Sequence, residues 1–268
     1  MRTYSQEAVC LEGGSRTPVS DELVLEEPLQ IILNERPFSI TMRTPGNDHD
    51  LVRGLLLAEG IASPEGLSGE IVLRQREGYS EASVHIPEVF LCRDLIADRS
   101  LLSNASCGFC GKREVKDLPR NLKLLQPSAR LTAHHIPAMG ARMRAHQAGF
   151  SRTGGCHAAA AFTIDGSLIL LHEDIGRHNA VDKVIGALAS SRRLPEAEVL
   201  FLSGRVSFEI VSKAHAAGIP IICAVSAPSS LAVQMSLDLG MSILGFCRNE
   251  RFTVYSNCHH IDSTPSST

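Results

Sequence analysis

The sequence contains no tryptophan, and aromatic residues make up only 4% of its 268 residues, so the core must be built mainly from aliphatic side chains. It also lacks a long apolar run. The longest, such as 219–225, fall far short of the ~20 residues that cross a membrane. Residues 1–10 contain no apolar stretch with a cleavage site, which predicts that there is no signal peptide. We therefore expect a cytoplasmic protein that has no membrane partner.

An excess of charge of one sign is also missing. The chain has 26 Lys and Arg against 29 Asp and Glu, a formal net charge of -3. Domains that bind nucleic acid are usually clearly basic, so the composition excludes a nucleic-acid partner. The eight cysteines do not predict a disulfide framework, because a chain of this length needs no covalent staples and a reducing cytoplasm keeps thiols free.

Two domains are expected: a smaller mixed α+β domain over residues 1–128 and an α/β domain over 129–262. The Ser/Thr/Pro-rich tail 263–268 is predicted to be disordered. The first twenty residues are polar and show no clear pattern. In the rest of the first domain the expected strands are 29–33, 38–42, 71–74 and 82–86, and the expected helix is 48–59, which ends at Gly60.

In the second domain strands alternate with helices, which predicts crossover connections on a mostly parallel sheet. The expected strands are 157–164, 167–171, 199–203, 219–225, 242–246 and 253–255. The expected helices are 136–147, 179–189, 208–217 and 230–239.

The motif with the clearest chemistry is Cys107-Gly108-Phe109-Cys110, in a Gly-rich stretch that predicts an exposed loop over 103–113. Two cysteines at this spacing can carry sulfur as a persulfide, form a redox disulfide or bind a metal, and the thiolate is the active form in each case. Lys112 and Arg113 follow directly and favour the thiolate.

Three other interpretations of this pair stay open beside sulfur transfer. A structural zinc site needs four ligands, and no second Cys-x-x-Cys follows, although 134–135 and 156–157 could contribute. A thioredoxin-like site places its pair at the start of a helix in an early βαβ unit, unlike this loop. An inert exposed pair is disfavoured because surface thiols are a liability. We assign no metal site.

Further polar segments follow predicted strands in the second domain. They are 153–157, 172–183, 203–209 and 226–230. Open α/β sheets bind ligands beyond the carboxyl ends of their strands, so these loops together predict one polar pocket for a phosphate-bearing ligand. Arg177 and Lys183 could contact an anion, and Asp174 could accept hydrogen bonds from a base or ribose. A cluster of caps and salt bridges is the alternative.

These segments together resemble the formate dehydrogenase accessory sulfurtransferase family. The resemblance is carried by 44–46, 54–61, 107–111, 153–155, 157–159, 173–183, 203–205, 218–220, 226–228 and 245–246. It implies a cytidine-deaminase-like fold for the second domain. It does not imply deamination, because 157–159 lacks the glutamate of the His-x-Glu motif and no later cysteine pair follows.

The resemblance also implies a function. Cys107 would carry a persulfide received from a cysteine desulfurase, and Cys110 would assist. The sulfur would pass to the molybdenum cofactor, in its bis(molybdopterin guanine dinucleotide) form, for formate dehydrogenase. A guanine nucleotide would mimic this ligand, and the protein would form a homodimer.

The residues implied to bind the cofactor are Phe246, Cys247, Arg248, Asn249, Glu250 and Arg251, with Asp174, Gly176, Arg177 and His178. Asn249 and Glu250 depart from the Pro-Gly that the family often has there. A chaperone that binds cofactor and enzyme without sulfur chemistry is the main alternative, and a zinc-held binding module is the third.

Overall fold

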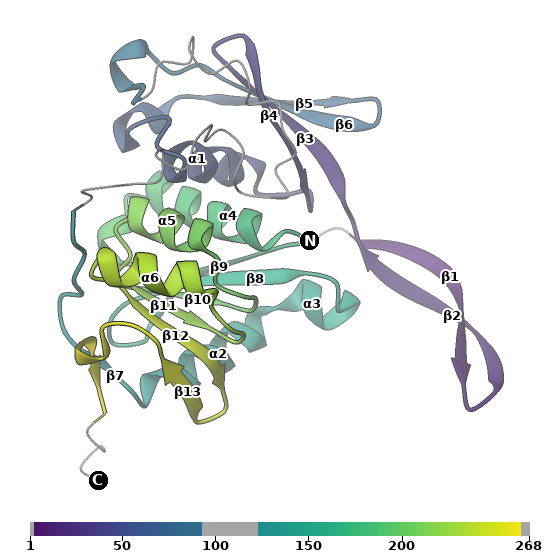
Figure 1. Cartoon of the computed structure of the whole chain (residues 1–268). Coiled ribbons are helices and arrows are strands. Elements are labelled where there is room, and N and C mark those ends of the chain that lie inside the picture. Colours follow the sequence, from purple (N-terminus) through teal and green to yellow (C-terminus); the bar gives the residue numbers. More distant parts are fainter. Residues whose placement is uncertain (1–2, 93–122, 264–268) are drawn as a thin grey trace.

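The structure is a computed structural model, and it describes residues 3–92 and 123–263. The predicted loop 103–113, with Cys107 and Cys110, lies outside these residues, as do residues 264–268 of the predicted tail. The described part contains two larger sheets separated by helices, with a narrow arm beside them (Figure 1).

The smaller of the two has four strands in the order β4-β3-β6-β5. They are β3 (Glu27–Leu33), β4 (Arg36–Arg43), β5 (Ile71–Arg76) and β6 (Tyr79–Val84). The predicted strands 29–33 and 38–42 are confirmed and form a hairpin: β3 pairs antiparallel with β4 around Asn34 and Glu35, which both have positive φ. Helix α1 (Asp48–Ala58) and the short turns η1 (Pro64–Ser68) and η2 (Glu88–Phe90) complete this region.

The larger sheet has six strands in the order β13-β12-β11-β10-β8-β9. They are β8 (His157–Phe162), β9 (Leu168–Asp174), β10 (Val199–Leu202), β11 (Ile221–Ala224), β12 (Ser242–Arg248) and β13 (Arg251–Val254). Only the β10–β11 and β11–β12 pairs are parallel, so the prediction of a mostly parallel sheet is wrong. The physical reason is that tight turns join β8 to β9 and β12 to β13, and such turns permit only antiparallel neighbours.

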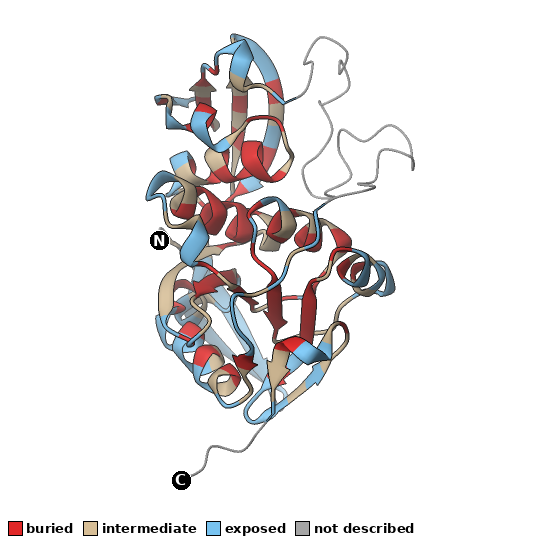
Figure 2. Cartoon of the chain, turned by 90° about the vertical axis from the view of Figure 1, so that its left-hand side faces the viewer, coloured by how far each residue is buried: buried red, intermediate tan, exposed pale blue. Residues whose placement is uncertain are grey.

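Helices cover both faces of this sheet, and its strands alternate between two apolar clusters. Helices α4 (Arg177–Ser190), α5 (Phe208–Ala216) and α6 (Ser230–Asp238) lie on one face, and α2 (His135–His146) lies on the other, followed by α3 (Ala148–Thr153). In β10, for example, Leu200 faces α4 and α5 while Phe201 faces α2. This period of two identifies strands that are buried on both faces (Figure 2). The fold is therefore a mixed α/β fold, as predicted at that level.

Helices α1 and α4 pack between the two sheets and join them. One apolar cluster contains Leu29 and Leu51 from the first region together with Val181 from the second. The helix backbones approach so closely at Gly54 and Gly186 that a Cβ atom at either glycine would overlap a carbonyl oxygen of the other helix. The two regions thus share one core, and the domain boundary at 128 stays a prediction.

A buried ion-pair cluster links the same helices to α5. Nζ of Lys213 donates to both carboxylate oxygens of Asp182, at 2.8 and 3.1 Å, and to Glu59 at 3.2 Å. The two carboxylates raise the pKa of Lys213 above its ordinary value despite its burial, so the lysine stays charged. Glu59 follows α1, Asp182 lies in α4 and Lys213 lies in α5, so one ammonium group connects three helices.

The N-terminal segment forms an arm that sequence patterning did not predict. Strands β1 (Thr3–Glu12) and β2 (Ser15–Val24) pair along ten residues, and almost every residue is exposed. Gly13 and Gly14 form the turn with positive φ, which is the pattern of a two-residue hairpin loop. The arm projects from the body (Figure 1), and its base touches α3, where Arg152 pairs with Glu22 at 3.6 Å, and the segment after α3, where Val24 lies beside Gly155.

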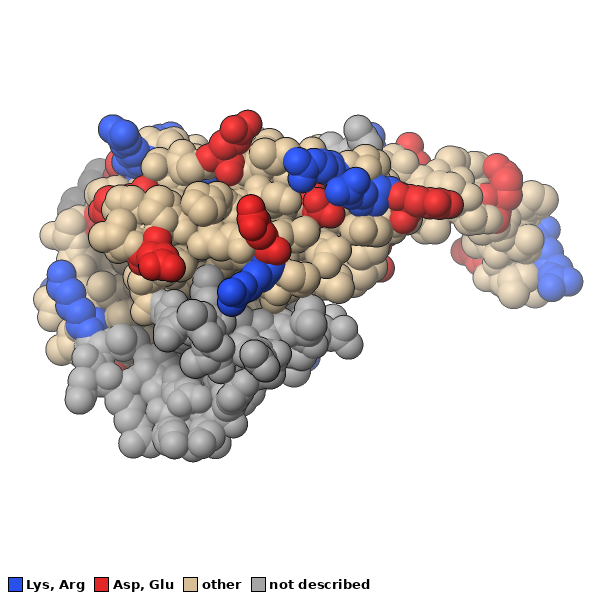
Figure 3. Space-filling view, turned by 90° about the horizontal axis from the view of Figure 1, so that it is seen from above, with Lys and Arg blue, Asp and Glu red and all other residues tan. Residues whose placement is uncertain are grey.

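The remaining elements are the pair β7 (Leu131–Thr132) and β14 (Ile261–Asp262) and the turns η5 (Leu194–Glu196) and η6 (Cys258–His260). No helix within residues 3–92 and 123–263 is long and apolar enough to cross a membrane. On the face shown in Figure 3, acidic and basic side chains are interspersed along the body and the arm.

Candidate functional site

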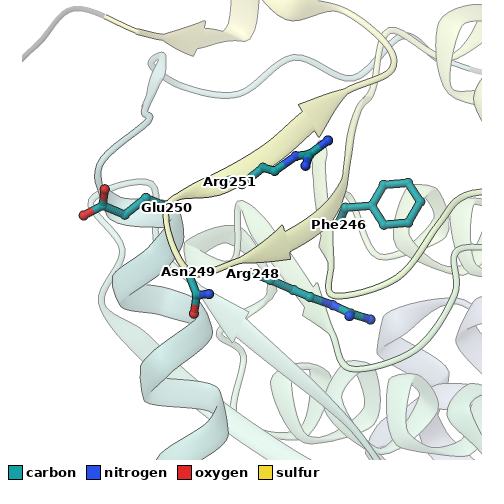
Figure 4. Close-up of a pocket in the computed structure, with 5 residues that line it drawn as sticks. All are labelled: Phe246, Arg248, Asn249, Glu250 and Arg251. Carbon is teal, nitrogen blue, oxygen red and sulfur yellow. The ribbon is translucent and has the colours of Figure 1, made fainter.

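The segment implied to bind the cofactor forms the turn between β12 and β13. Five of its residues line a cavity of about 620 Å³: Phe246, Arg248, Asn249, Glu250 and Arg251. Figure 4 shows Phe246, Arg248 and Arg251 extending to the same side of the hairpin, while Glu250 at the tip points away. The structure therefore brings these predicted residues together, although Asn249 and Glu250 at the turn do not extend to the side of the other three.

A β-bulge sets the direction of these side chains. The β12–β13 register shifts between Gly245 and Arg248, and Phe246 has a φ of 55°. A left-handed residue reverses the alternation of faces, so the aromatic ring turns out of the core and is 43% exposed. The backbone is held there because Phe246 N–H donates to the Ser226 carbonyl at 3.1 Å and Arg248 Nε donates to Val225 at 3.1 Å. An exposed aromatic ring beside two guanidinium groups suits a planar base that carries phosphates.

A second cavity of about 780 Å³ adjoins the first and shares Arg248 and Asn249 with it. Its other walls come from α2, α3 and the segment 154–157. Among the described residues that line it there is no carboxylate, whereas Arg144 and Arg248 supply guanidinium groups. The Arg144 guanidinium lies 4.4 Å from the centre of the Phe150 ring, which fixes its position. This cavity suits an anionic ligand.

The loops predicted to converge beyond the parallel strands do so. Loop 203–207 after β10 and loop 226–229 after β11 bond to each other, because Val206 N–H donates to the Ala227 carbonyl at 3.1 Å. Ser203 lies at the edge of the larger cavity and accepts a hydrogen bond from Ala158 N–H at 2.9 Å. The structure thus brings these two loops together, and their binding of a phosphate-bearing ligand stays a prediction.

His157 lies at the same edge of the cavity, close to Arg177. Burial lowers the pKa of His157, and Arg177 and Arg205 lower it further, so the imidazole is neutral at neutral pH. Gly204 permits this packing, because a Cβ there would lie 3.2 Å from His157 Nδ1 and 3.7 Å from Arg177 Cδ. Nε of Arg177 is buried and has no hydrogen-bond partner among the described residues. Arg177 thus has an unused donor close to a cavity residue.

Asp174 is placed differently from a ligand-binding carboxylate. It is fully buried, and its Oδ2 pairs with Lys183 Nζ at 2.7 Å and accepts from Thr44 N–H at 3.1 Å. Its Oδ1 accepts from Gly176 N–H at 2.8 Å and from Asn179 at 3.1 Å. Both oxygens are therefore engaged by the protein, which favours the cluster of caps and salt bridges for this residue. The cluster ties the start of α4 to the turn at Thr44.

His178 lies on the far side of the same helix start. Its Nε2 is 3.2 Å from Ser207 Oγ, and Glu209 lies 3.9 Å away. Burial lowers its pKa to about 4, with further contributions from Arg177 and Lys213, so it is neutral at neutral pH. Gly176 precedes the helix and lies close to the Asn179 side chain. These two residues shape the loop, and neither lines the two cavities.

Two residues of the larger cavity were missed from the sequence. Arg144 lies in α2 and Phe150 in α3, outside every polar segment that follows a strand. Neither residue type signals a site when it lies in a helix without a motif. Within residues 3–92 and 123–263, no group of three or more His, Cys, Asp or Glu side chains could hold a metal ion.

Comparisons with known proteins show the family of this chain. Residues 24–262 match the model of the FdhD/NarQ family. This chain belongs to the FdhD/NarQ family. A relative from Streptomyces avermitilis, named sulfur carrier protein FdhD, is 39% identical over 269 residues, which cover 97% of this chain and 95% of the relative. Proteins of the same name from Sulfolobus acidocaldarius and Nocardia farcinica are 41% and 42% identical and cover 94% and 92% of this chain.

Among solved structures, a formate dehydrogenase accessory protein from Desulfotalea psychrophila has the same fold. Its TM-score is 0.76 at 23% sequence identity, and the match covers 97% of this chain and 99% of that one. At this identity the likeness concerns the fold alone. The resemblance derived from the sequence motifs is thus confirmed at the level of the FdhD/NarQ family.

Proposed function

We propose that this protein is a sulfur carrier for formate dehydrogenase. In this proposal Cys107 accepts persulfide sulfur from a cysteine desulfurase and passes it to the molybdenum cofactor, bis(molybdopterin guanine dinucleotide). Family membership and the names of the relatives support the carrier role. The observation that carries the cofactor as substrate is the pair of adjoining cavities that share Arg248 and Asn249, with an exposed aromatic ring at one end.

The residues of both cavities fit such a ligand. A guanine base can stack on Phe246, whose ring lies free on the surface side of the bulge. Its phosphates can be held by Arg248 and Arg251 through charge-assisted hydrogen bonds. Arg144 extends the positive lining into the larger cavity, where the rest of the ligand can lie. The bound molybdenum supplies the acceptor for the sulfur.

The transfer itself follows from thiolate chemistry. The Cys107 thiolate attacks the outer sulfur of the donor persulfide, and the donor leaves as a thiolate, so no oxidant or reductant is consumed. The rate depends on access and on the thiolate fraction, both of which a Gly-rich loop with Lys112 and Arg113 would favour. Cys110 assists in one of two ways: its thiolate takes the outer sulfur and Cys107 leaves as a thiolate, or it attacks the inner sulfur of the Cys107 persulfide, so that sulfide leaves and the Cys107–Cys110 disulfide that forms is reduced by an external thiol. The cytidine-deaminase-like fold, the homodimer and the cytoplasmic location belong to the same proposal.

Mass spectrometry of the intact protein tests the carrier role. After incubation with a cysteine desulfurase and cysteine, the wild-type protein is expected to gain the mass of one or more sulfur atoms. The Cys107→Ala variant is expected to lose the gain at that site, because the thiolate that attacks the donor is absent. Cys258→Ala, which removes an exposed thiol elsewhere, serves as the control. If neither wild type nor variants gain sulfur, a cofactor-binding chaperone becomes the better explanation.

Nucleotide binding tests the cavity independently of sulfur. GDP, measured by calorimetry, is expected to bind the wild-type protein, and Arg248→Ala or Arg251→Ala each to weaken binding by about tenfold or more, since a hydrogen bond to a charged group contributes roughly 1.5–3 kcal/mol.

Two control variants accompany this measurement. Arg76→Ala and Arg193→Ala each remove an exposed arginine outside both cavities, paired with Glu81 and Glu196 respectively. Both are expected to keep the wild-type affinity. Equal loss in all four variants would indicate nonspecific charge attraction rather than a built site.

A further inference from the structure

The larger cavity brings together cysteines that the Cys-x-x-Cys chemistry does not use. Cys156 and Cys247 both line it, and Cys223 lies beside Cys247 in the apolar cluster beneath the cavity. Cys223 is fully buried in β11, whereas Cys247 is 7% exposed. The cavity wall therefore contains two thiols, one of which has a third thiol behind it.

The bulge that exposes Phe246 also places Cys247. In β12, Leu244 pairs with Cys223 of β11 and faces the cluster under α2. With regular alternation Phe246 would face this cluster too, but its left-handed conformation gives the position to Cys247. The Cys247 thiol then donates to the Leu244 carbonyl oxygen at 3.6 Å, and Cys223 belongs to the same apolar cluster.

The two cavity thiols differ in their surroundings. The hydrogen bond with Cys223 lowers the pKa of Cys247, while Cys223 itself keeps its proton because the same contact and its burial raise its pKa well above the usual range. For Cys156, burial and the nearby Glu173 carboxylate raise the pKa to about 12. Cys156 is held as a thiol that donates to Glu173 at 3.4 Å, whereas the Cys247 thiol donates to a backbone carbonyl.

We propose that Cys247 is a second sulfur-accepting residue, located in the wall of the cofactor cavity, with Cys223 as its hydrogen-bond donor. The inference rests on the proposed sulfur-carrier function and adds a second residue that can hold a persulfide, inside the binding site. Arg144 and Arg248 are the guanidinium groups of the same wall, and they favour the approach of a persulfide donor that carries carboxylates, such as glutathione persulfide.

The step conserves atoms and electrons. The Cys247 thiolate attacks the outer sulfur of a persulfide, R–S–SH, and forms the new S–S bond. The S–S bond of the donor breaks, its electron pair stays on the inner sulfur, and the donor leaves as the thiolate R–S⁻. The product is Cys247–S–SH. The hydrogen of the outer sulfur moves with it, so the reaction needs no further oxidant or reductant.

Peptide-resolved mass spectrometry tests the proposal on the full-length chain. The protein is treated with glutathione persulfide, capped with an alkylating reagent and digested. Cys247 is expected to gain one sulfur and Cys156 to stay unmodified, although both line the same cavity. Fragment ions must separate Cys247 from Cys223, because trypsin leaves both in the peptide 214–248. Absence of sulfur on Cys247, or equal loading of Cys156, would overturn the assignment.

A pair of variants at Cys223 tests the role of the donor. Cys223→Ala removes the hydrogen-bond donor and is expected to slow the modification of Cys247 at neutral pH severalfold, because the pKa of Cys247 rises without this contact and its thiolate fraction falls. Cys223→Ser keeps a hydroxyl donor in a side chain of similar size and is expected to retain most of the rate. Thermal unfolding of both variants identifies any loss of folding. Equal rates in two folded variants would refute the role of Cys223.

The choice of sulfur donor separates the test of this inference from the test of the proposed function. A cysteine desulfurase tests loading of Cys107, whereas glutathione persulfide reaches Cys247 directly, also in a Cys107→Ser/Cys110→Ser variant. If glutathione persulfide loads Cys247 but the desulfurase does not load Cys107, the carrier proposal is refuted and the inference is supported. The reverse result would sink the inference alone.

Discussion

Replacing Cys107 with alanine is expected to reduce formate dehydrogenase activity, in a host that lacks its own family member, to the level of cells without the gene. The reason is chemical: the sulfur must be held covalently in transit, and alanine offers no nucleophile to hold it. Binding of the cofactor is expected to persist in this variant, because the two cavities are built from residues 136–157, 203, 225 and 246–251.

Two comparisons sharpen this measurement. Cys110→Ala is expected to keep part of the activity, since Cys110 assists rather than carries the sulfur, and Cys258→Ala is expected to keep all of it. Full activity in a Cys107→Ser/Cys110→Ser variant would instead support a chaperone that binds cofactor and enzyme without sulfur chemistry.

The second large effect is expected from Gly54→Ala in α1. In a solvent-exposed helix this substitution stabilises by about 1 kcal/mol through helix propensity. Here the new Cβ would overlap the Asp182 carbonyl oxygen and lie 2.6 Å from its carbonyl carbon, so α1 and α4 must separate. Two backbones cannot yield as a side chain can. We expect the free energy of unfolding to fall by about 3 kcal/mol or more, beyond the usual range for overpacking.

Urea unfolding of two further variants controls this result. Gly186→Ala places a Cβ at the same helix crossing but on α4, 2.7 Å from the Asp50 carbonyl carbon. It is expected to lower the free energy of unfolding by a similar amount. Gly140→Ala in α2 meets the edge of the Phe201 ring at 3.2 Å, a side chain that can shift, and is expected to change stability by less than about 1 kcal/mol. Wild-type stability in Gly54→Ala would contradict the close crossing.

The consequence of this crossing reaches the functional site. Thr44 precedes α1, and its backbone and hydroxyl bond to Asp174 and Ile175 at the start of α4. Separating α1 from α4 therefore pulls on the loop that contains Arg177. Loss of nucleotide binding in Gly54→Ala would follow from displaced backbone, although the mutated residue lies outside both cavities.

The sequence predicted the elements of the second domain well, because buried strands and amphipathic helices have local periodicity. It predicted the wrong sheet topology where a strand returned through a tight turn instead of a crossover, as at β8–β9. It missed β1 and β2, since an exposed ribbon has no alternation between core and solvent. The strongest local indication of a hairpin turn in this segment was Gly13-Gly14.

In the candidate site, too, local sequence motifs predicted one part and tertiary packing decided the other. The sequence by itself determined the Cys107-x-x-Cys110 pair and the grouping of residues 246–251, because both are contiguous motifs whose chemistry depends on residue type and spacing. Tertiary structure alone decided that Arg144 and Phe150 line the cavity. It also decided that the Asp174 carboxylate is paired with Lys183 and bonded by Thr44. The third such feature is that Cys247 rather than Phe246 lies in the cluster that contains Cys223. Each of these depends on how distant backbones pack or on one left-handed residue in a bulge, and neither is encoded in a local pattern of hydrophobic and polar residues.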